Sequence, residues 1–202
     1  MKREDLVTPS KNPTFIGSWI IEPPDLCDEL IAYFESNTQQ HKKGVAGGVV
    51  DLEAKNSIDI AMSPNEILLS GNEAFKMYFE SLFACYQDYV ARWPFLNVFE
   101  NEELHIGSFN IQRYGIGQHF QKIHTERSSL STLHRLFAWM TYLNDVDSDD
   151  GGTTLFSHYG LEIQPKKGLT LIWPAEWTHA HKGNVLRKNS KYIITGWMHF
   201  PS

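Results

Sequence analysis

The chain has 202 residues, of which 42% are hydrophobic and 21% charged, and its formal net charge is -6. These values predict one soluble globular domain with a sizeable core. The acidic balance, with no basic run longer than a pair, predicts no nucleic-acid partner, and no apolar run approaches the roughly 18 residues of a membrane span.

The polar first twelve residues lack the apolar core of a secretory signal, and the two cysteines, Cys27 and Cys85, lie far apart in the sequence. We expect both to be buried thiols rather than a disulfide, which suits a reducing compartment. A cytoplasmic location is therefore expected.

Residues from about 13 to 100 are expected to be mainly helical. Apolar residues at helical spacing follow Asp25, the expected N-cap: Leu26, Leu30, Ile31 and Phe34. A longer helical pattern runs from about Pro64 to Trp93, is interrupted near Gly71, and is ended by Pro94. Between these two patterns, residues 44–61 predict a turn and short strands.

From residue 104 to about 200 the pattern changes to short strands separated by turn residues. The candidate strands are 104–114, 135–144, 154–156, 169–174, 178–182 and 191–199. Helices followed by many short strands predict an α+β fold, in which helices pack on a β-sandwich or barrel. We expect residues 1–202 to form a single domain with its chemistry in the all-β half.

His124-Thr125-Glu126 is the first candidate for a metal site. Residues at i and i+2 of an extended segment point to the same side, so the imidazole and the carboxylate can converge on one ion. His179 or His181 would supply a third ligand. Two histidines and one carboxylate form the facial triad of non-heme iron(II) oxygenases. The triplet alone is a weak signal, because it arises readily by chance in a chain with nine histidines.

Further motifs surround this triplet in a fixed order. They are Tyr114-Gly115-Ile116-Gly117, Tyr142-Leu143-Asn144, Asp150-Gly151-Gly152-Thr153-Thr154, Pro165-Lys166-Lys167-Gly168, His181 and Lys191. With them, the segment from Tyr114 to Trp197 resembles the prolyl 4-hydroxylase-like branch of the iron(II)/2-oxoglutarate dioxygenases. In that family a basic residue follows the distal metal histidine by about ten positions. Lys191 stands ten positions after His181 and twelve after His179, which favours His181 and leaves His179 as a neighbouring group or the alternative ligand.

The resemblance implies a fold, cofactors and roles for individual residues. The fold would be a double-stranded β-helix, a jelly-roll or cupin-like barrel supported by the N-terminal helices, with the catalytic core in residues 104–200. The catalytic metal ligands for Fe(II) would be His124, Glu126 and His181. The residues expected to bind 2-oxoglutarate are Lys191, Tyr142, Tyr114 and Thr195. Ascorbate would serve as a reductant.

Several of these residues also have ordinary structural interpretations. Tyr142 and Tyr114 could be packed core tyrosines, and Lys191 could be a solvated strand residue. Arg127 directly follows the triad carboxylate, where it would clamp a substrate carboxylate or form a surface ion pair.

The sequence departs from the family pattern at two positions near the triad. Glu126 stands where the family usually has aspartate, and glutamate reaches roughly 1.5 Å further. Phe120 stands one residue further from His124 than is usual, which predicts a small bulge. The retained carboxylate favours hydroxylation, since halogenating relatives lack it.

The expected reaction is hydroxylation of a C–H bond with O2, which releases succinate and CO2 from 2-oxoglutarate. The substrate is expected to be peptidyl proline or another protein group, with residues 44–61 and 127–134 as the contacting loops. The alternatives are a free amino acid or small metabolite as substrate, a catalytically silent metal- or carboxylate-binding module, and a cupin-like metal enzyme that needs no 2-oxoglutarate.

Overall fold

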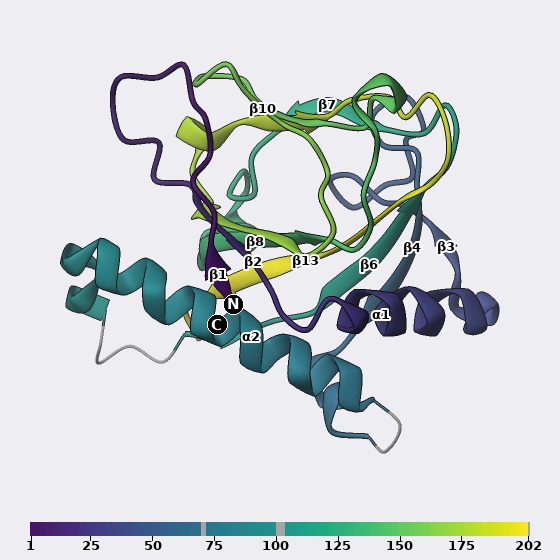
Figure 1. The fold of residues 1–202 in the computed structure, drawn as a ribbon, viewed down its shortest axis with the longest axis horizontal. Coiled ribbons are helices and arrows are strands. Elements are labelled where there is room, and N and C mark those ends of the chain that lie inside the picture. Colours follow the sequence, from purple (N-terminus) through teal and green to yellow (C-terminus); the bar gives the residue numbers. More distant parts are fainter. Residues whose placement is uncertain (70–71, 100–103, 202) are drawn as a thin grey trace.

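Two antiparallel β-sheets face each other and form a barrel, and two helices lie along the outer face of the larger sheet (Figure 1). The computed structural model describes residues 1–69, 72–99 and 104–201. Two sheets closed over one interior are the architecture of a double-stranded β-helix. The predicted α+β fold is therefore confirmed.

The larger sheet has nine strands in the order β1-β2-β11-β8-β13-β6-β4-β3, with β5 paired to β13. Their bounds are β1 Lys2–Arg3, β2 Gly17–Ile20, β3 Lys42–Lys43, β4 Ile58–Met62, β5 His105–Ile106, β6 Phe109–Tyr114, β8 Arg135–Tyr142, β11 Leu169–Pro174 and β13 Lys191–His199. The first hundred residues thus supply strands to this sheet as well as helices.

The smaller sheet has four strands in the order β10-β9-β12-β7. Their bounds are β7 Phe120–His124, β9 Thr154–Phe156, β10 Leu161–Ile163 and β12 His181–Gly183. In Figure 1, β7 and β10 lie across the barrel from β8 and β13.

The helices are α1 Asp25–Ser36 and α2 Glu73–Arg92, and short 3-10 turns are η1 Thr38–Gln40, η2 Pro64–Leu68, η3 Pro94–Phe99, η4 Leu130–Thr132, η5 Ser148–Asp150 and η6 Trp177–His179. The buried face of α2 follows helical spacing: Phe75, Tyr78, Leu82, Cys85 and Tyr89. Within the described ranges, neither helix is long and apolar enough to cross a membrane.

Successive side chains of β13 point alternately into two hydrophobic cores, one on each face of the larger sheet. Ile194 and Met198 pack with both helices in the first core, whereas Ile193 packs between the two sheets in the second. Residues at i and i+2 of a strand share a face. Lys191 and Trp197 therefore lie on the face of β13 that lines the barrel interior.

Several sequence predictions are confirmed residue by residue. The strands over 154–156, 169–174 and 191–199 have the predicted limits, and both cysteines are buried free thiols. The helical pattern at 64–93 divides into η2 and α2, in agreement with its expected interruption, and Gly71 itself lies outside the described residues. Two expectations are wrong in detail. Pro24, not Asp25, is the N-cap of α1. The predicted strand 178–182 begins only at His181, because a 3-10 turn precedes it.

Gly196 provides a test of the packing between β13 and the helix-side core. A methyl group added there would lie 2.6 Å from Trp139 Cζ2 and 2.9 Å from Phe109 Cβ, closer than carbon atoms pack. Gly196→Ala should therefore lower the free energy of unfolding by about 1–3 kcal/mol in urea denaturation. Gly115→Ala is the matched control, since its nearest neighbour would be Gln118 Oε1 at 3.5 Å. Equal stability of the two variants would contradict this packing.

Candidate metal centre

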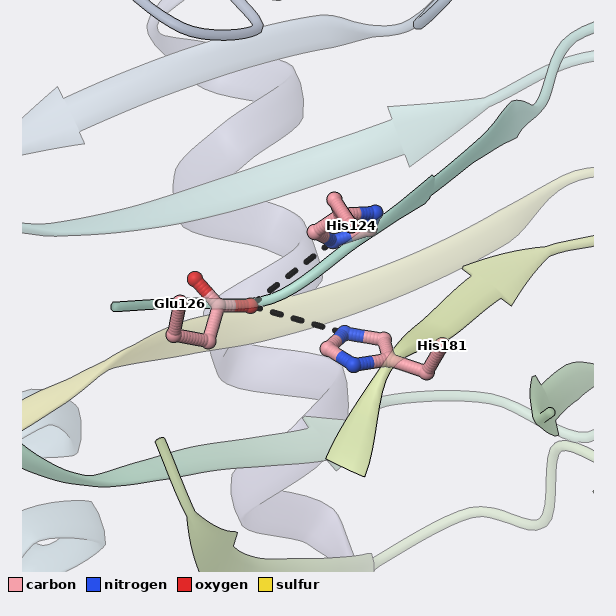
Figure 2. A group of neighbouring side chains, drawn as sticks. All are labelled: His124, Glu126 and His181. Atoms are coloured by element: carbon pink, nitrogen blue, oxygen red, sulfur yellow. Dashed lines mark ion pairs between the residues drawn. The ribbon is translucent and has the colours of Figure 1, made fainter. Parts of the chain in front are cut away.

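His124, Glu126 and His181 converge on one point inside the barrel (Figure 2). His124 ends β7, His181 begins β12, and the antiparallel pairing of these strands places the two residues opposite each other. Glu126 Oε1 lies 3.7 Å from His124 Nε2 and 3.4 Å from His181 Nε2. Ligand atoms of the three residues all lie within 4.8 Å of one another, the arrangement of a small metal site.

Backbone carbonyls determine which nitrogen of each imidazole faces this point. His124 Nδ1 lies 2.8 Å from the Lys122 carbonyl, and His181 Nδ1 lies 2.9 Å from the His179 carbonyl. A carbonyl oxygen only accepts, so each Nδ1 carries a proton, and the Nε2 atom of each ring faces Glu126. In the neutral form of either ring, that Nε2 atom offers a lone pair to the point that Glu126 Oε1 also faces. A divalent cation fits this donor set.

The charges at the site agree with metal binding. Burial alone would raise the pKa of Glu126, but hydrogen bonds and charges from His181, His124 and Trp197 outweigh it and lower the pKa to about 2. Burial, followed by the neighbouring His181, lowers the pKa of His124 to about 4. At neutral pH Glu126 is therefore ionised and His124 is neutral, which are the forms that bind metals.

Aromatic side chains support both imidazoles. Phe120 stacks on His124 with ring centroids 3.8 Å apart, and Trp173 and Phe156 pack against His181 at 5.2 and 5.3 Å. His181 pairs with His124 and Gly183 with Phe120, so a step of two residues along β12 corresponds to a step of four residues along β7. This irregular register confirms the bulge that the spacing of Phe120 predicts.

Two residues of the larger sheet hold Glu126. Trp197 Nε1 donates a 2.7 Å hydrogen bond to Glu126 Oε2, and Arg135 donates to the Glu126 main-chain oxygen at 2.9 Å. The sequence carries no signal for either role, since a tryptophan and an arginine in strands are most often core and surface residues. Their roles depend on contacts between distant parts of the chain.

Lys191 lies in the barrel with its ammonium group buried. Its Nζ donates to the Gly152 carbonyl at 2.7 Å and lies 4.5 Å from the centroid of the Tyr114 ring. No carboxylate of the described residues forms an ion pair with it, and burial lowers its pKa to about 7. A buried cation with spare donors fits the distal carboxylate of 2-oxoglutarate.

The other expected cosubstrate residues also lie in the barrel wall. Tyr142 donates to Thr154 Oγ1 at 2.7 Å, Tyr114 donates to Gln112 Oε1 at 2.8 Å, and burial raises the pKa of both phenols. The Thr195 hydroxyl donates to the Trp139 carbonyl at 2.8 Å. Each hydroxyl already has a protein partner, so contact with 2-oxoglutarate stays a prediction for these three residues.

His179 and Arg127 lie outside the group of converging ligand atoms. His179 sits in η6, where its Nε2 is 2.8 Å from the Thr14 carbonyl, and its own carbonyl accepts from His181 Nδ1. Arg127 forms an ion pair with Glu176 and donates to the Leu133 carbonyl at 2.7 Å. These contacts favour the ion-pair interpretation of Arg127, and a role in substrate binding stays a prediction.

Comparison with known proteins identifies the barrel. Residues 109–199 match the family model described as the 2OG-Fe(II) oxygenase superfamily. The barrel of this chain is therefore similar to that superfamily. The match includes the whole of the candidate metal centre and Lys191.

Related proteins agree with the predicted branch of this family. The chain is 26% identical over 119 residues to prolyl 4-hydroxylase subunit alpha-1 of Homo sapiens, a match that covers 52% of this chain and 21% of that protein. The chain therefore spans about a fifth of the length of the curated relatives it matches. A prolyl-4-hydroxylase of Pseudomonas putida is similar in structure, with a TM-score of 0.71 at 16% identity, over 91% of this chain and 92% of that one.

A prolyl hydroxylase of Trichoplax adhaerens is also similar, with a TM-score of 0.68 at 18% identity, over 90% of this chain and 83% of that one. That structure was solved in complex with a hypoxia inducible factor oxygen degradation domain peptide fragment. At such identities the structural likeness establishes the shared fold.

Lys191 should destabilise the oxygenase barrel when no ligand is bound. Its pKa falls from an ordinary 10.5 to about 7 on folding, so between these pH values the unfolded chain binds the extra proton. This destabilisation is complete below pH 7 and disappears as the pH rises toward 10.5. Lys191→Met should therefore raise the Tm of the ligand-free protein at pH 7, by about 2–4 °C for each kcal/mol gained.

Scanning calorimetry at pH 7 and pH 10 tests this prediction, with Lys43→Met on the exposed strand β3 as the control. The increase in Tm caused by Lys191→Met should be smaller at pH 10 than at pH 7. A Tm below that of the parent protein at both pH values would contradict it.

Proposed function

We propose that this chain is an Fe(II)- and 2-oxoglutarate-dependent oxygenase that hydroxylates a C–H bond. One observation carries the proposal, namely that the same barrel holds two histidines and a carboxylate in converging geometry and a buried lysine without a carboxylate partner among the described residues. A silent metal-binding module has no need of both features, and a cupin-like enzyme that needs no 2-oxoglutarate has no need of the lysine.

The proposal assigns a task to each of these residues. His124, Glu126 and His181 would hold Fe(II), and Lys191 would bind the far carboxylate of 2-oxoglutarate. Iron and 2-oxoglutarate together supply the oxidation by O2, with succinate and CO2 as the other products. The chain itself orients the cosubstrate between its two anchors and surrounds the reaction with the apolar wall of the barrel.

A peptide or protein is the substrate class that the observations favour. The relatives are prolyl hydroxylases, and one was solved with a peptide. Two loops adjoin β7 and Glu126. In the first loop, residues 54–56 form backbone hydrogen bonds with residues 119 and 122. In the second loop, Arg135 donates to the Glu126 main-chain oxygen and Arg127 donates to the Leu133 carbonyl. Exposed apolar side chains gather on both loops: Val49, Val50, Leu52, Leu130 and Leu133. Such residues suit contact with a peptide chain.

The cofactor requirement is the first test of this function. Purified protein should form succinate from 2-oxoglutarate only with added Fe(II), with ascorbate included to keep the iron reduced. His124→Ala should reduce the rate to background, because one of three metal ligands is lost. Lys191→Met should raise the KM for 2-oxoglutarate by about 10-fold or more, since about 1.4 kcal/mol of lost binding corresponds to each factor of ten.

Lys43→Met is the control for loss of a positive charge and should leave both the rate and the KM unchanged. No succinate under any condition, together with unchanged metal binding in His124→Ala, would contradict the proposed metal site.

The substrate class has a separate test. Proline-containing peptides should stimulate succinate release above the rate without substrate, and the peptide product should gain the mass of one oxygen atom. Free amino acids, L-proline included, should give less stimulation. Stimulation by free L-proline but by none of the peptides would instead favour a small-metabolite hydroxylase.

A further inference from the structure

The two oxygens of the Glu126 carboxylate have different partners. Oε1 faces His124 Nε2 and His181 Nε2 at 3.7 and 3.4 Å, whereas Oε2 accepts the Trp197 indole N–H at 2.7 Å. An N–H donor at Oε2 uses one of the two lone pairs of that oxygen and fixes the orientation of the carboxylate, with Oε1 toward the two histidines. The carboxylate is therefore presented to the metal point through one oxygen.

Arg135 contacts both Glu126 and Trp197. Its guanidinium group donates to the Glu126 main-chain oxygen at 2.9 Å and lies over the Trp197 ring at 3.6 Å from the centroid. Its NH1 is also 3.8 Å from Glu126 Oε2. Arg135 begins β8 and Trp197 lies on the neighbouring strand β13, where it pairs with Ala138. The glutamate is thus positioned by the larger sheet, while both histidines belong to the smaller one.

The length of the side chain explains why such support matters. Glutamate has one more rotatable bond than aspartate, so an unsupported Glu126 carboxylate would lose conformational freedom on binding a metal. It could also turn to chelate the ion through both oxygens. That would use a coordination position which the facial triad leaves open for 2-oxoglutarate and O2.

We propose that Trp197 and Arg135 form a clamp that makes glutamate a one-oxygen metal ligand at a position where the family resemblance implies aspartate. Both are positioning residues that act through Glu126. This inference rests on the proposed function in so far as the three ligands bind a metal. It adds two residues to the site and gives the glutamate variant a physical basis.

Cobalt(II) binding tests the clamp without catalysis. Trp197→Phe retains an aromatic ring for Arg135 to stack on and removes the N–H donor together with part of the indole ring system. Because loss of a group that orients a metal ligand typically weakens metal binding by about 10–100-fold, we expect at least about 10-fold weaker Co²⁺ binding, followed by visible absorption. The Co²⁺ spectrum should also change, since a carboxylate that binds through both oxygens alters the coordination number.

A double-mutant cycle separates the clamp from general damage to the site. In a Glu126→Asp background the shorter carboxylate no longer reaches the indole, so adding Trp197→Phe should weaken Co²⁺ binding by less than about 2-fold. Trp93→Phe is the matched control, because Trp93 also lies under an arginine, Arg92 at 5.6 Å, but on the helix side of the sheet. It should bind Co²⁺ as the parent protein does.

Arg135→Met tests the same clamp without changing Trp197 and should weaken Co²⁺ binding in the same direction. Circular dichroism of the metal-free variants establishes that each one is folded. Equal effects of Trp197→Phe in the two backgrounds, or no effect in folded Trp197→Phe and Arg135→Met, would overturn the clamp and leave the metal site standing. Failure of the parent protein to bind Co²⁺ would overturn the metal site and the clamp together.

Discussion

The pairing of His124 with His181 across β7 and β12 is the constraint on which the candidate site depends. These residues belong to strands more than fifty positions apart in the chain, and only this register brings their Nε2 atoms to the same carboxylate oxygen. A shift by one residue would turn one imidazole to the other face of the sheet. Phe120, at the other end of β7, stacks on the His124 imidazole, and the pairing of β7 with β12 is irregular between these two residues.

The second sheet completes the site through the alternation of β13. Lys191 and Trp197 share the face that lines the barrel, and Ile194 and Met198 on the other face pack against the helices. The same strand therefore anchors the barrel to its helical support and presents both the proposed cosubstrate anchor and the donor to Glu126. Packing on one face makes the positions on the other face well defined.

The barrel interior carries buried charge that a purely structural core would avoid. Lys191 has no carboxylate partner among the described residues, while Lys55 is buried against Asp59 at 2.6 Å, with Ser57 donating to the other Asp59 oxygen. A buried charge without a partner lowers stability, whereas a paired one roughly offsets the cost of its burial. The contrast between the paired and the unpaired lysine is the clearest physical sign that Lys191 serves a ligand rather than the fold.

Much of this protein could be predicted from local sequence. Hydrophobic alternation and turn residues predict the limits of β9, β11 and β13, and the ten-residue spacing from His181 to Lys191 selects the histidine that the structure places beside His124 and Glu126. These features depend on residues within one or two neighbouring segments, so their pattern is visible in the sequence. The ordered motifs likewise predict the family whose model matches residues 109–199.

Other features were decided only by the tertiary structure. The 3-10 turn at His179, the pairing of β7 with β12, and the contact of Trp197 with Glu126, 71 residues away, have no local signal. A tryptophan in a strand has the same hydrophobic pattern whether its N–H is buried in the core or donates to a metal ligand. Sequence determines which residues face the barrel, because side chains alternate along a strand. The partners they find there depend on how the two sheets close, because the contacting atoms come from segments far apart in the chain.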